Sequence, residues 1–300
     1  MSDGTKIEWT DATWNPIVGC SVVSPGCTNC YAMRLAGTRM KSHPSRVGLT
    51  RDSKAGPVWT GEVRFMEPWL TQPLRWSKPR MIFVCAHADL FHEAVPDEWI
   101  DRVFAVMALC PQHTFQVLTK RPARMHAMMK AVCRPGLPER VTGVLSRMAR
   151  DGVVTQTDAM RAICRRVIAL PNVWLGVSVE DQRRADERIP ILLDTPAAVR
   201  WISAEPLLGL LDLARIVLIS SDAPDLGKPD VSINALTGWL GSSAADMARL
   251  DWVVAGGESG PSARPMHPDW ARSLRDQCEK AGVPFLFKQW GEWAPAEDYP

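Results

Sequence analysis

Residues 14–31 read Trp14-Asn15-Pro16-Ile17-Val18-Gly19-Cys20-Ser21-Val22-Val23-Ser24-Pro25-Gly26-Cys27-Thr28-Asn29-Cys30-Tyr31. The apolar run that ends at Val18 predicts a strand, the segment after it predicts a loop, and the residues from Tyr31 onward predict a helix. The three cysteines have a C-x6-C-x2-C spacing. A closed structural zinc site uses four protein ligands, whereas a cluster held by three cysteines leaves one metal position open. The loop is therefore predicted to be a reactive metal site more than a scaffold.

The same order of strand, loop and helix is repeated along the chain. Seven short apolar runs predict strands, at residues 14–18, 81–85, 115–119, 173–177, 199–203, 252–255 and 284–288. Segments with helical periodicity lie between them, at residues 31–41, 97–109, 121–132, 181–193 and 267–281. This alternation is typical of parallel β-α units. We therefore predict an α/β fold, a partial or complete parallel (β/α) barrel of six to seven β-α units.

Length and interruptions of the pattern predict the domain organisation. A chain of 300 residues with 46% hydrophobic content falls in the range of one α/β barrel domain. Three stretches break the rhythm, at about residues 42–77, 134–167 and 220–250. We interpret them as insertions on a single domain that spans residues 1–300. The first insertion is expected to hold a short hairpin around residues 58–65.

Composition limits which cellular compartment and which binding partners we expect for this protein. The formal net charge is only +2, so a nucleic acid would have to bind to a local patch. The N-terminus lacks the apolar run of a signal peptide, and no apolar stretch reaches the roughly 18 residues of a membrane span, so we expect a cytoplasmic protein with no membrane contact. A reducing compartment disfavours disulfides. Most of the cysteines outside the loop are expected to be buried: Cys85, Cys110, Cys133, Cys164 and Cys278.

Polar groups recur where the predicted strands end, and in a parallel barrel these ends form the reactive face. They include the three cysteines, Asp89, Lys120, Ser178, Glu180, Glu205, Gly256-Gly257-Glu258 and Lys288. One polar residue after a strand is more often a helix cap or a solvated turn, and Asp181 and Thr119 fit that interpretation. The series as a whole indicates one binding mouth. The glycine run lacks the spacing of phosphate loops, and a plain tight turn is its alternative.

Longer motifs span residues 7–293 and carry a family resemblance. They are Thr13-Trp14-Asn15-Pro16, Gly19-Cys20, Ser24-Pro25-Gly26-Cys27-Thr28-Asn29-Cys30-Tyr31-Ala32, Asp89-Leu90-Phe91-His92-Glu93, Leu118-Thr119-Lys120-Arg121, Trp174-Leu175-Gly176-Val177-Ser178, Glu205-Pro206-Leu207, Gly256-Gly257-Glu258-Ser259-Gly260 and Phe287-Lys288-Gln289-Trp290-Gly291. By these motifs the chain resembles the radical S-adenosylmethionine (SAM) superfamily, within it a phage- and bacteria-associated three-cysteine family of largely unassigned substrate. The usual superfamily spacing is C-x3-C-x2-C with an aromatic residue before the last cysteine. Here the first gap has six residues, and Asn29 stands before Cys30 while Tyr31 follows it.

The resemblance implies a radical-SAM-like barrel with a cofactor and a set of site residues. Cys20, Cys27 and Cys30 would ligate a 4Fe-4S cluster, and SAM would bind the fourth iron and be cleaved reductively to a 5′-deoxyadenosyl radical. The residues expected to contact the cofactor are Tyr31, Ser178, Glu180, Gly256, Gly257 and Glu258. Those expected to serve catalysis or substrate binding are Asp89, Lys120, Glu205 and Lys288. A lysine would fix a substrate phosphate or carboxylate, and a carboxylate would act as an acid, a base or an orienting group.

Two classes of function stay open at this point. In the first, the enzyme acts on a nucleotide, nucleobase or nucleic acid, with an electron donor such as flavodoxin or ferredoxin. The nucleic-acid expectation rests on the phage association and on arginines of the second insertion, although a peptide or small metabolite is equally open: Arg134, Arg140, Arg147, Arg150, Arg161, Arg165 and Arg166. In the second, a non-catalytic zinc-stabilised barrel binds nucleic acid or a protein partner, with Cys85 or His87 as a fourth ligand.

Overall fold

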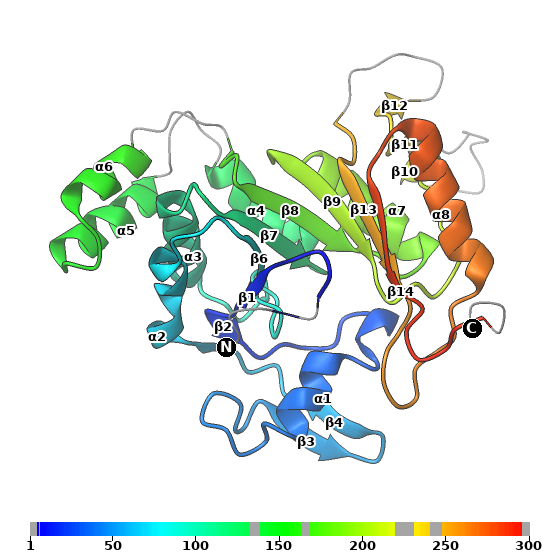
Figure 1. Cartoon of the computed structure of the whole chain (residues 1–300), viewed down its shortest axis with the longest axis horizontal. Helices are drawn as coiled ribbons and strands as arrows, with labels where there is room; N and C mark the ends of the chain where they lie inside the picture. The colour runs from blue at the N-terminus through cyan, green and yellow to red at the C-terminus, as the bar shows by residue number, and fades with distance from the viewer. Residues whose placement is uncertain are drawn as a thin grey trace. The chain divides into compact units, whose positions relative to one another are not determined.

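The computed structural model describes residue 5 and residues 7–132, 139–163, 169–219, 231–240 and 248–295. The chain forms two compact units, one of Met1–Leu175 with Pro196–Ala198 and one of Gly176–Thr195 with Val199–Pro300. Figure 1 labels the elements of both units. The single domain with three insertions stays a prediction. Some residues named above lie outside the described part of the chain: Cys133, Cys164, Arg134, Arg165, Arg166 and the side chain of Arg161.

The first unit is built on parallel strands with helices after them. β1 (Ala12–Trp14), β6 (Met81–Val84) and β7 (Thr114–Thr119) are neighbours in that order and run parallel, and β8 (Val173–Ser178), which both units share, comes next. α3 (Asp97–Leu109) follows β6, and α4 (Pro122–Val132) follows β7. Trp14 and Phe115 are fully buried, with ring centroids 5.7 Å apart. Large apolar rings thus fill the core between neighbouring strands.

The predicted strand at residues 14–18 is wrong, because the chain breaks it in two. β1 ends at Trp14, and β2 (Ile17–Val18) instead pairs antiparallel with β5 (Arg64–Phe65). Pro16 lies at the break, where its missing N–H group cannot serve a sheet ladder. The cysteine loop therefore follows β2, and it contains the short helix η1 (Pro25–Cys27) before α1 (Tyr31–Gly37) begins.

The hairpin of the first insertion lies earlier than predicted. β3 (Thr50–Ser53) and β4 (Gly56–Trp59) form it, and residues 64–65 belong to β5 instead. The hairpin packs against α1, as Figure 1 shows. A Cβ atom on Gly37 would lie 2.1 Å from Pro57 Cβ, so this contact needs a glycine in the helix. Two short helices, α2 (Glu67–Leu70) and η2 (Gln72–Arg75), complete the insertion.

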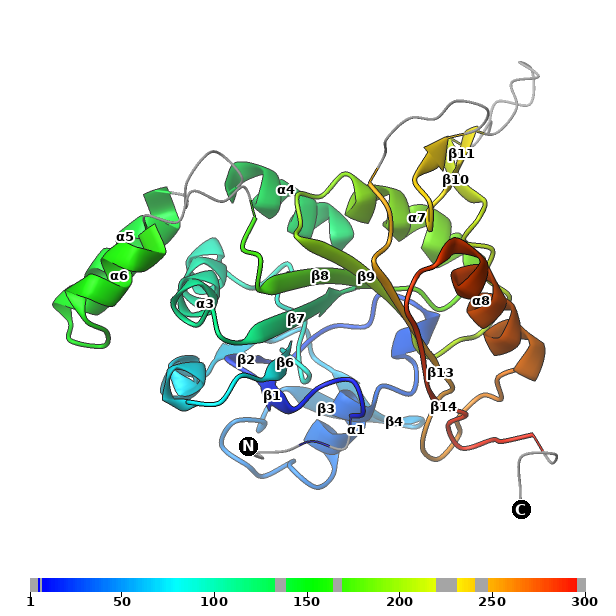
Figure 2. The same ribbon diagram turned by 45° about the horizontal axis from the view of Figure 1, so that its top comes forward.

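The described part of the second insertion is helical. α5 (Glu139–Arg150) and α6 (Gln156–Ile163) lie side by side and pack against α3 (Figure 2). α5 buries Val144 and Leu145. On its polar side Arg140 pairs with Asp97 and Asp101, each at 3.2 Å. One of the predicted basic side chains is thus engaged within the protein.

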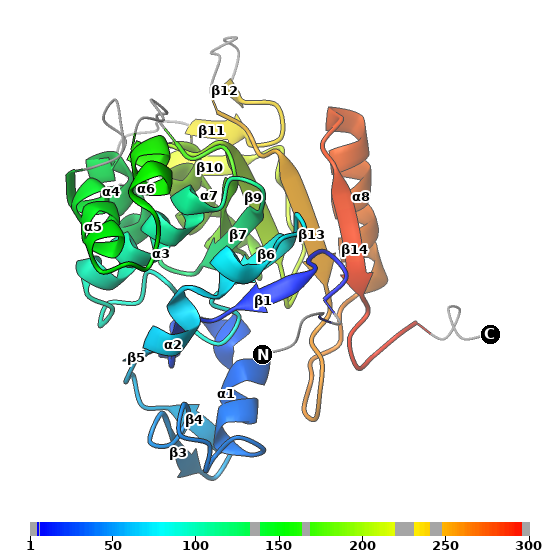
Figure 3. The ribbon, with the colours of Figure 1, turned by 60° about the vertical axis from the view of Figure 1, so that its left-hand side comes forward.

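The second unit repeats the parallel arrangement. After β8, the strands β9 (Val199–Ala204), β13 (Trp252–Gly256) and β14 (Phe285–Gln289) follow in that order, and the β9-β13 and β13-β14 pairs run parallel. α7 (Gln182–Leu193) follows β8, and α8 (Pro268–Ala281) packs against β13 and β14 (Figure 3). A Cβ on Gly176 would lie 2.6 Å from the Trp201 ring, which stacks on Trp252. A small antiparallel sheet of β10 (Ile216–Ile219), β11 (Val231–Asn234) and β12 (Trp239–Leu240) completes the unit.

The fold class is confirmed as α/β, with parallel β-α units of the kind that build partial barrels. Each of the six predicted strands after the first lies within one residue of an observed strand. Across the described ranges, no helix has both the length and the hydropathy needed to cross a membrane.

The start of α7 provides a test of local sequence control. Asp181 is its N-cap, and Oδ1 accepts a hydrogen bond from the Arg184 amide at 2.9 Å. Asp181→Ala should lower the free energy of unfolding by about 1 kcal/mol because that amide loses its partner. Asp181→Asn retains an acceptor and is the matched control, expected close to wild type in urea denaturation. Equal stability of the alanine variant and wild type would contradict the cap.

Candidate functional site

The three cysteines occupy three different backbone positions on one loop. Cys20 lies two residues after β2, Cys27 ends η1, and Cys30 is the N-cap of α1. All three are free thiols and are partly buried. Cys20 and Cys30 pack against an apolar cluster that includes Met33 and Leu49. Two of the three thiols on the loop are thus packed on this cluster.

Electrostatic effects show that the thiols interact. Burial, followed by the charges of Asp89, Cys30 and Cys27, raises the pKa of Cys20 to about 12, whereas Arg121 opposes the shift. Burial also raises the pKa of Cys30, while hydrogen bonds from the amides of Met33 and Ala32 lower it. Within the ranges that the structure describes, no group of three His, Cys, Asp or Glu side chains forms a ready metal cage. The thiols are therefore gathered on one loop without forming a ligand cage.

Arg121 links the cysteine loop to the end of β7. Its Nη2 donates to Ser21 Oγ at 2.7 Å, and its Nη1 lies 3.8 Å from Cys20 Sγ. The same Nη1 donates to Asp89 Oδ2 at 3.0 Å, and Nε donates to both oxygens of Glu93. The side chains of Arg121 and Asp89 are each more than nine-tenths buried. This guanidinium joins the loop to the residues that follow β6 and β7.

Asp89 is held from several sides by the ends of two strands. Its Oδ1 accepts from the Phe91 amide at 3.0 Å and from the Thr119 hydroxyl at 2.7 Å. Its Oδ2 accepts from the Lys120 amide at 3.0 Å, in addition to Arg121. A carboxylate with so many donors is fixed in position. Its geometry suits a supporting role beside the cysteine loop.

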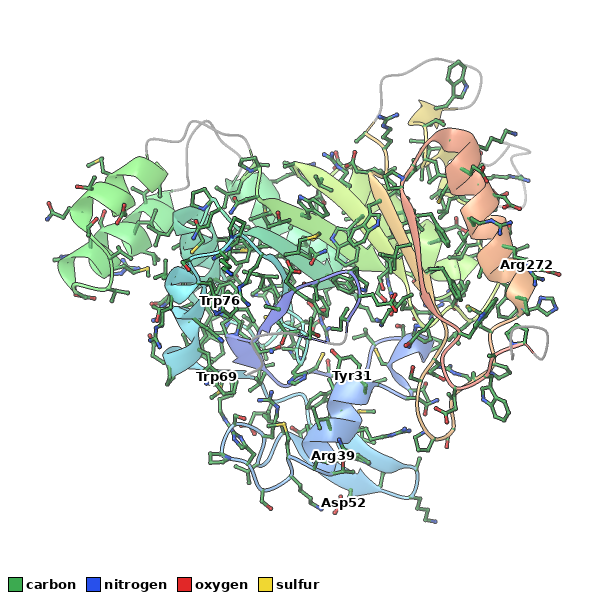
Figure 4. All side chains as sticks on the ribbon, in the orientation of Figure 1. Tyr31, Arg39, Asp52, Trp69, Trp76 and Arg272 are labelled. Atoms are coloured by element: carbon green, nitrogen blue, oxygen red, sulfur yellow. The ribbon has the colours of Figure 1, made fainter. Side chains whose placement is uncertain are left out.

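Tyr31 and Lys120 lie on the same side of the first unit as the loop. Tyr31 stands at the start of α1 (Figure 4), and its hydroxyl donates to the Ala86 carbonyl at 2.5 Å. Its ring meets His87 edge to face, with centroids 6.1 Å apart. The positive charge of Lys120 lowers the pKa of Cys30, which places that charge within range of the last cysteine. The Lys120 charge thus acts on the loop.

His87 is held by Arg46 rather than by a cysteine. Arg46 Nη2 lies 2.6 Å from His87 Nδ1, and both side chains are largely buried. Burial, followed by the charge of Arg46, lowers the pKa of His87 to about 4. The His87 imidazole is therefore neutral at ordinary pH, and it accepts a hydrogen bond from the Arg46 guanidinium.

In the second unit, two predicted carboxylates are neutralised by arginines. Glu180 is fully buried, and its Oε2 accepts from Arg188 Nη1 at 3.0 Å. Glu258 is also buried, and it accepts from Nε and Nη2 of Arg264 at 2.9 and 2.5 Å. Ser178 donates to the Glu205 carbonyl at 3.3 Å. These contacts are made entirely within the protein, so a structural role accounts for them.

The glycine run packs closely on the end of β14. A Cβ on Gly257 would lie 1.7 Å from the Trp290 carbonyl oxygen, whereas one on Gly256 would lie 3.4 Å from Glu205 Cγ. The Gly257 amide donates to the Gln289 carbonyl at 2.9 Å. Contact between two strand ends therefore explains the glycine at position 257.

Glu205 and Lys288 form an ion pair at the ends of β9 and β14. Lys288 Nζ donates to Glu205 Oε2 at 2.5 Å, and both side chains are mostly buried. Glu205 Oε1 is buried and has no hydrogen-bond partner among the described residues. A buried carboxylate oxygen without a donor is unusual. This pair is the one predicted group in the second unit with hydrogen-bonding capacity left over.

The structure places the predicted site residues in two groups, one in each unit. The cysteines, Tyr31, Asp89 and Lys120 belong to the first unit, and the others belong to the second. Sequence reasoning missed Ser21 and the arginines that pair with the carboxylates. Arg121 carried a usable signal, because it directly follows Thr119-Lys120 at a strand end.

Fold and loop together define an α/β protein of parallel β-α units with a three-cysteine loop. The chain matches the family described as "Protein of unknown function (DUF5131)" over residues 4–299, and it belongs to that family. No curated protein and no solved structure matches it.

The Glu180–Arg188 pair leads to a stability prediction. Glu180→Gln leaves the guanidinium buried without its countercharge, and it should lower the free energy of unfolding by about 3 to 5 kcal/mol. The double variant Glu180→Gln with Arg188→Met should recover most of that loss. Glu187→Gln is the control, because the Glu187 side chain is 47% exposed and surface pairs contribute less than about 1 kcal/mol. Denaturant titration measures all three, and a Glu180→Gln variant as stable as wild type would refute the structural role.

Gly257 provides a second test. Gly257→Ala should lower the free energy of unfolding by about 1 to 3 kcal/mol, because the new methyl group collides with backbone that cannot move aside cheaply. Gly209→Ala is the matched control, since its nearest neighbour would be Asp181 Cβ at an ordinary 3.8 Å. Thermal unfolding of both variants measures this difference in stability. A Gly257→Ala protein that melts with the control would show that packing does not explain this glycine.

Proposed function

We propose that this protein is a radical SAM enzyme, in which Cys20, Cys27 and Cys30 hold a 4Fe-4S cluster with SAM at the open iron. The observation that carries the proposal is the loop of three free, electrostatically interacting thiols after β2. The motif resemblance over residues 7–293 supports it, and so does the α/β fold of parallel β-α units. The radical-SAM-like character of that fold is part of the proposal. The three other described cysteines, Cys85, Cys110 and Cys278, are buried in the core.

The donor set fits this cluster chemically. Ligation needs thiolates, and thiolates are favoured by nearby cations and by backbone amides. Cys30 accepts hydrogen bonds from the amides of Ala32 and Met33, and Lys120 adds positive charge. Cys20 has the guanidinium of Arg121 beside it. Fixed groups of the protein therefore offset part of the charge that three thiolates would bring.

When bound, the cluster and SAM supply a one-electron cleavage that yields methionine and a 5′-deoxyadenosyl radical. The protein's own residues would bind and orient the substrate. Lys120 in the first unit and Lys288 in the second are each of a type that suits a phosphate or carboxylate. Glu205 Oε1 suits an N–H or O–H donor, because it has no partner among the described residues. A nucleotide, nucleobase or nucleic acid presents both kinds of group, and flavodoxin or ferredoxin would deliver the electron.

The contacts divide the predicted residues by role. Asp89, Glu180 and Glu258 are occupied by arginines of this chain, so they position backbone and loops in this proposal. Gly257 allows two strand ends to approach closely, whereas a Cβ at Gly256 would make an ordinary contact. The carboxylate most suited to meet a ligand is then Glu205, with Lys288 as its neighbour.

The competing zinc-binding function draws weaker support. Of its two candidate fourth ligands, His87 has Nδ1 against Arg46. Cys85 interacts electrostatically with Cys20, but it is completely buried, and burial strongly raises its pKa. A thiol that resists deprotonation is a poor zinc ligand. Zinc content nevertheless belongs in the same experiment.

Anaerobic purification and iron-sulfur reconstitution test the proposal. We expect brown protein with about four iron and about four sulfide per chain, and 5′-deoxyadenosine after addition of SAM and dithionite. Replacing Cys20, Cys27 or Cys30 by alanine should abolish both the bound cluster and the formation of 5′-deoxyadenosine. Cys110→Ala is the matched control, because this cysteine lies in the core away from the loop and should leave both unchanged.

The opposite result is equally clear. Colourless protein with about one zinc per chain, which makes no 5′-deoxyadenosine even after reconstitution, would overturn the proposal. It would favour the zinc-stabilised binding protein instead.

A further inference from the structure

We infer that Arg121 is a positioning residue for the cysteine loop, which holds Cys20 in place and supplies the fixed positive charge that favours a reduced cluster. The inference rests on the proposed function and assigns a role to a residue outside the predicted ligand and substrate sets. It makes Arg121 a determinant of how readily the cluster takes up an electron.

The position of Arg121 is set by the end of β7. The Thr119 hydroxyl oxygen accepts from the Arg121 amide at 2.9 Å, so the backbone turns at this point in a fixed way. Arg121 immediately precedes α4, whose first residue is Pro122. The side chain is then only 5% exposed. A long side chain buried this completely has lost its rotamer freedom before any ligand binds.

The guanidinium reaches two successive residues of the loop. It lies 3.8 Å from Cys20 Sγ and donates to Ser21 Oγ at 2.7 Å. Ser21 Oγ also lies 2.9 Å from His92 Nε2, so the hydroxyl is held from two sides. The start of the loop is thereby anchored to the ends of β6 and β7. Lys120, which follows β7, also acts on the loop, because its charge lowers the pKa of Cys30.

Two carboxylates aim the guanidinium at the sulfur. Asp89 accepts from Nη1, and Glu93 accepts from Nε. Bonds on these two edges fix the orientation of the planar group, a control that a lysine ammonium cannot give. The two carboxylates and Cys20 more than offset the effect of burial and raise the pKa of Arg121, so the cation persists at every ordinary pH.

The charge has a direct consequence for electron uptake. Reduction adds one negative charge to a cluster that three thiolates already make negative. A fixed cation close to a ligand sulfur, inside the protein, stabilises the reduced form more than the oxidised form. Removing Arg121 should therefore lower the midpoint potential. Removing a nearby carboxylate such as Glu93 should raise it, by less, because the Glu93 side chain is 66% exposed and screened by solvent.

The arrangement also accounts for the long first gap of the motif. Cys20 is anchored by Arg121 to strand ends, whereas Cys27 and Cys30 are fixed by η1 and the start of α1. The six residues between the first two cysteines connect these two anchors. The need to connect these two anchors thus explains the six-residue gap in this chain.

Full-length, anaerobically reconstituted proteins test the inference. They are wild type, Arg121→Met, Arg121→Lys, Glu93→Gln and Arg124→Met. Arg124 is the matched control, because it pairs with Asp97 and donates to backbone carbonyls without touching a cysteine. The readouts are the midpoint potential of the cluster and the rate at which a chelator removes iron. Circular dichroism verifies folding.

For Arg121→Met we expect a reduction equilibrium at least tenfold less favourable, a shift of about 59 mV to lower potential for one electron, and roughly tenfold faster iron loss. Arg121→Lys should keep most of the midpoint potential, since it keeps the positive charge. It should still lose iron faster than wild type, since it lacks the paired hydrogen bonds of the guanidinium. Glu93→Gln should move the potential upward. If Arg121 were merely structural, Arg121→Met and Glu93→Gln would not shift the midpoint potential in opposite directions.

Failure of the inference and failure of the proposed function give different results. If wild type holds a cluster and both Arg121→Met and Glu93→Gln have the potential of Arg124→Met, the inference is overturned and the proposed function stands. If wild type holds no cluster, both are overturned. Should Arg121→Met not fold, Arg121→Lys and Glu93→Gln decide alone, and unchanged potential and iron loss in both would refute the inference.

Discussion

The buried ion pair between Arg121 and Asp89 is the constraint on which the first unit's site depends. Its two charges lie 3.0 Å apart with little contact to solvent, so removing Arg121 would leave the buried Asp89 carboxylate without its countercharge. Asp89 binds the backbone after β6 and β7, and Arg121 extends the same network to Cys20 and Ser21. The position of the cysteine loop is thus decided by electrostatics at strand ends as well as by the apolar packing beneath it.

The second unit uses the same device with different partners. Glu180 and Glu258 are each paired with an arginine from the same unit. A carboxylate at a strand end is therefore weak grounds for a ligand when the chain provides its own cation. Glu205 differs, because one of its oxygens stays without a partner among the described residues while the other binds Lys288. The distinction between structural and ligand-binding carboxylates rests on such leftover hydrogen-bonding capacity.

The proposed chemistry places opposite demands on the cysteine loop. Burial excludes water and raises the pKa of Cys20 and Cys30, which disfavours the thiolates that ligation requires. The amides at the start of α1, Lys120 and Arg121 act in the other direction. A loop that is buried enough to protect a reactive group, and still supplied with fixed positive charge, meets both demands.

Local patterns in the sequence determined the α/β class, the bounds of α3, the Asp181 cap and the grouping of three cysteines, because each depends on residues a few positions apart. Only the tertiary structure decided the break after Trp14, the place of the β3-β4 hairpin and the partners of the charged residues. Asp89 and Arg121 are 32 residues apart, and Glu205 and Lys288 are 83 apart. Such pairings depend on the path of the whole chain, since any carboxylate can meet any cation until packing chooses between them.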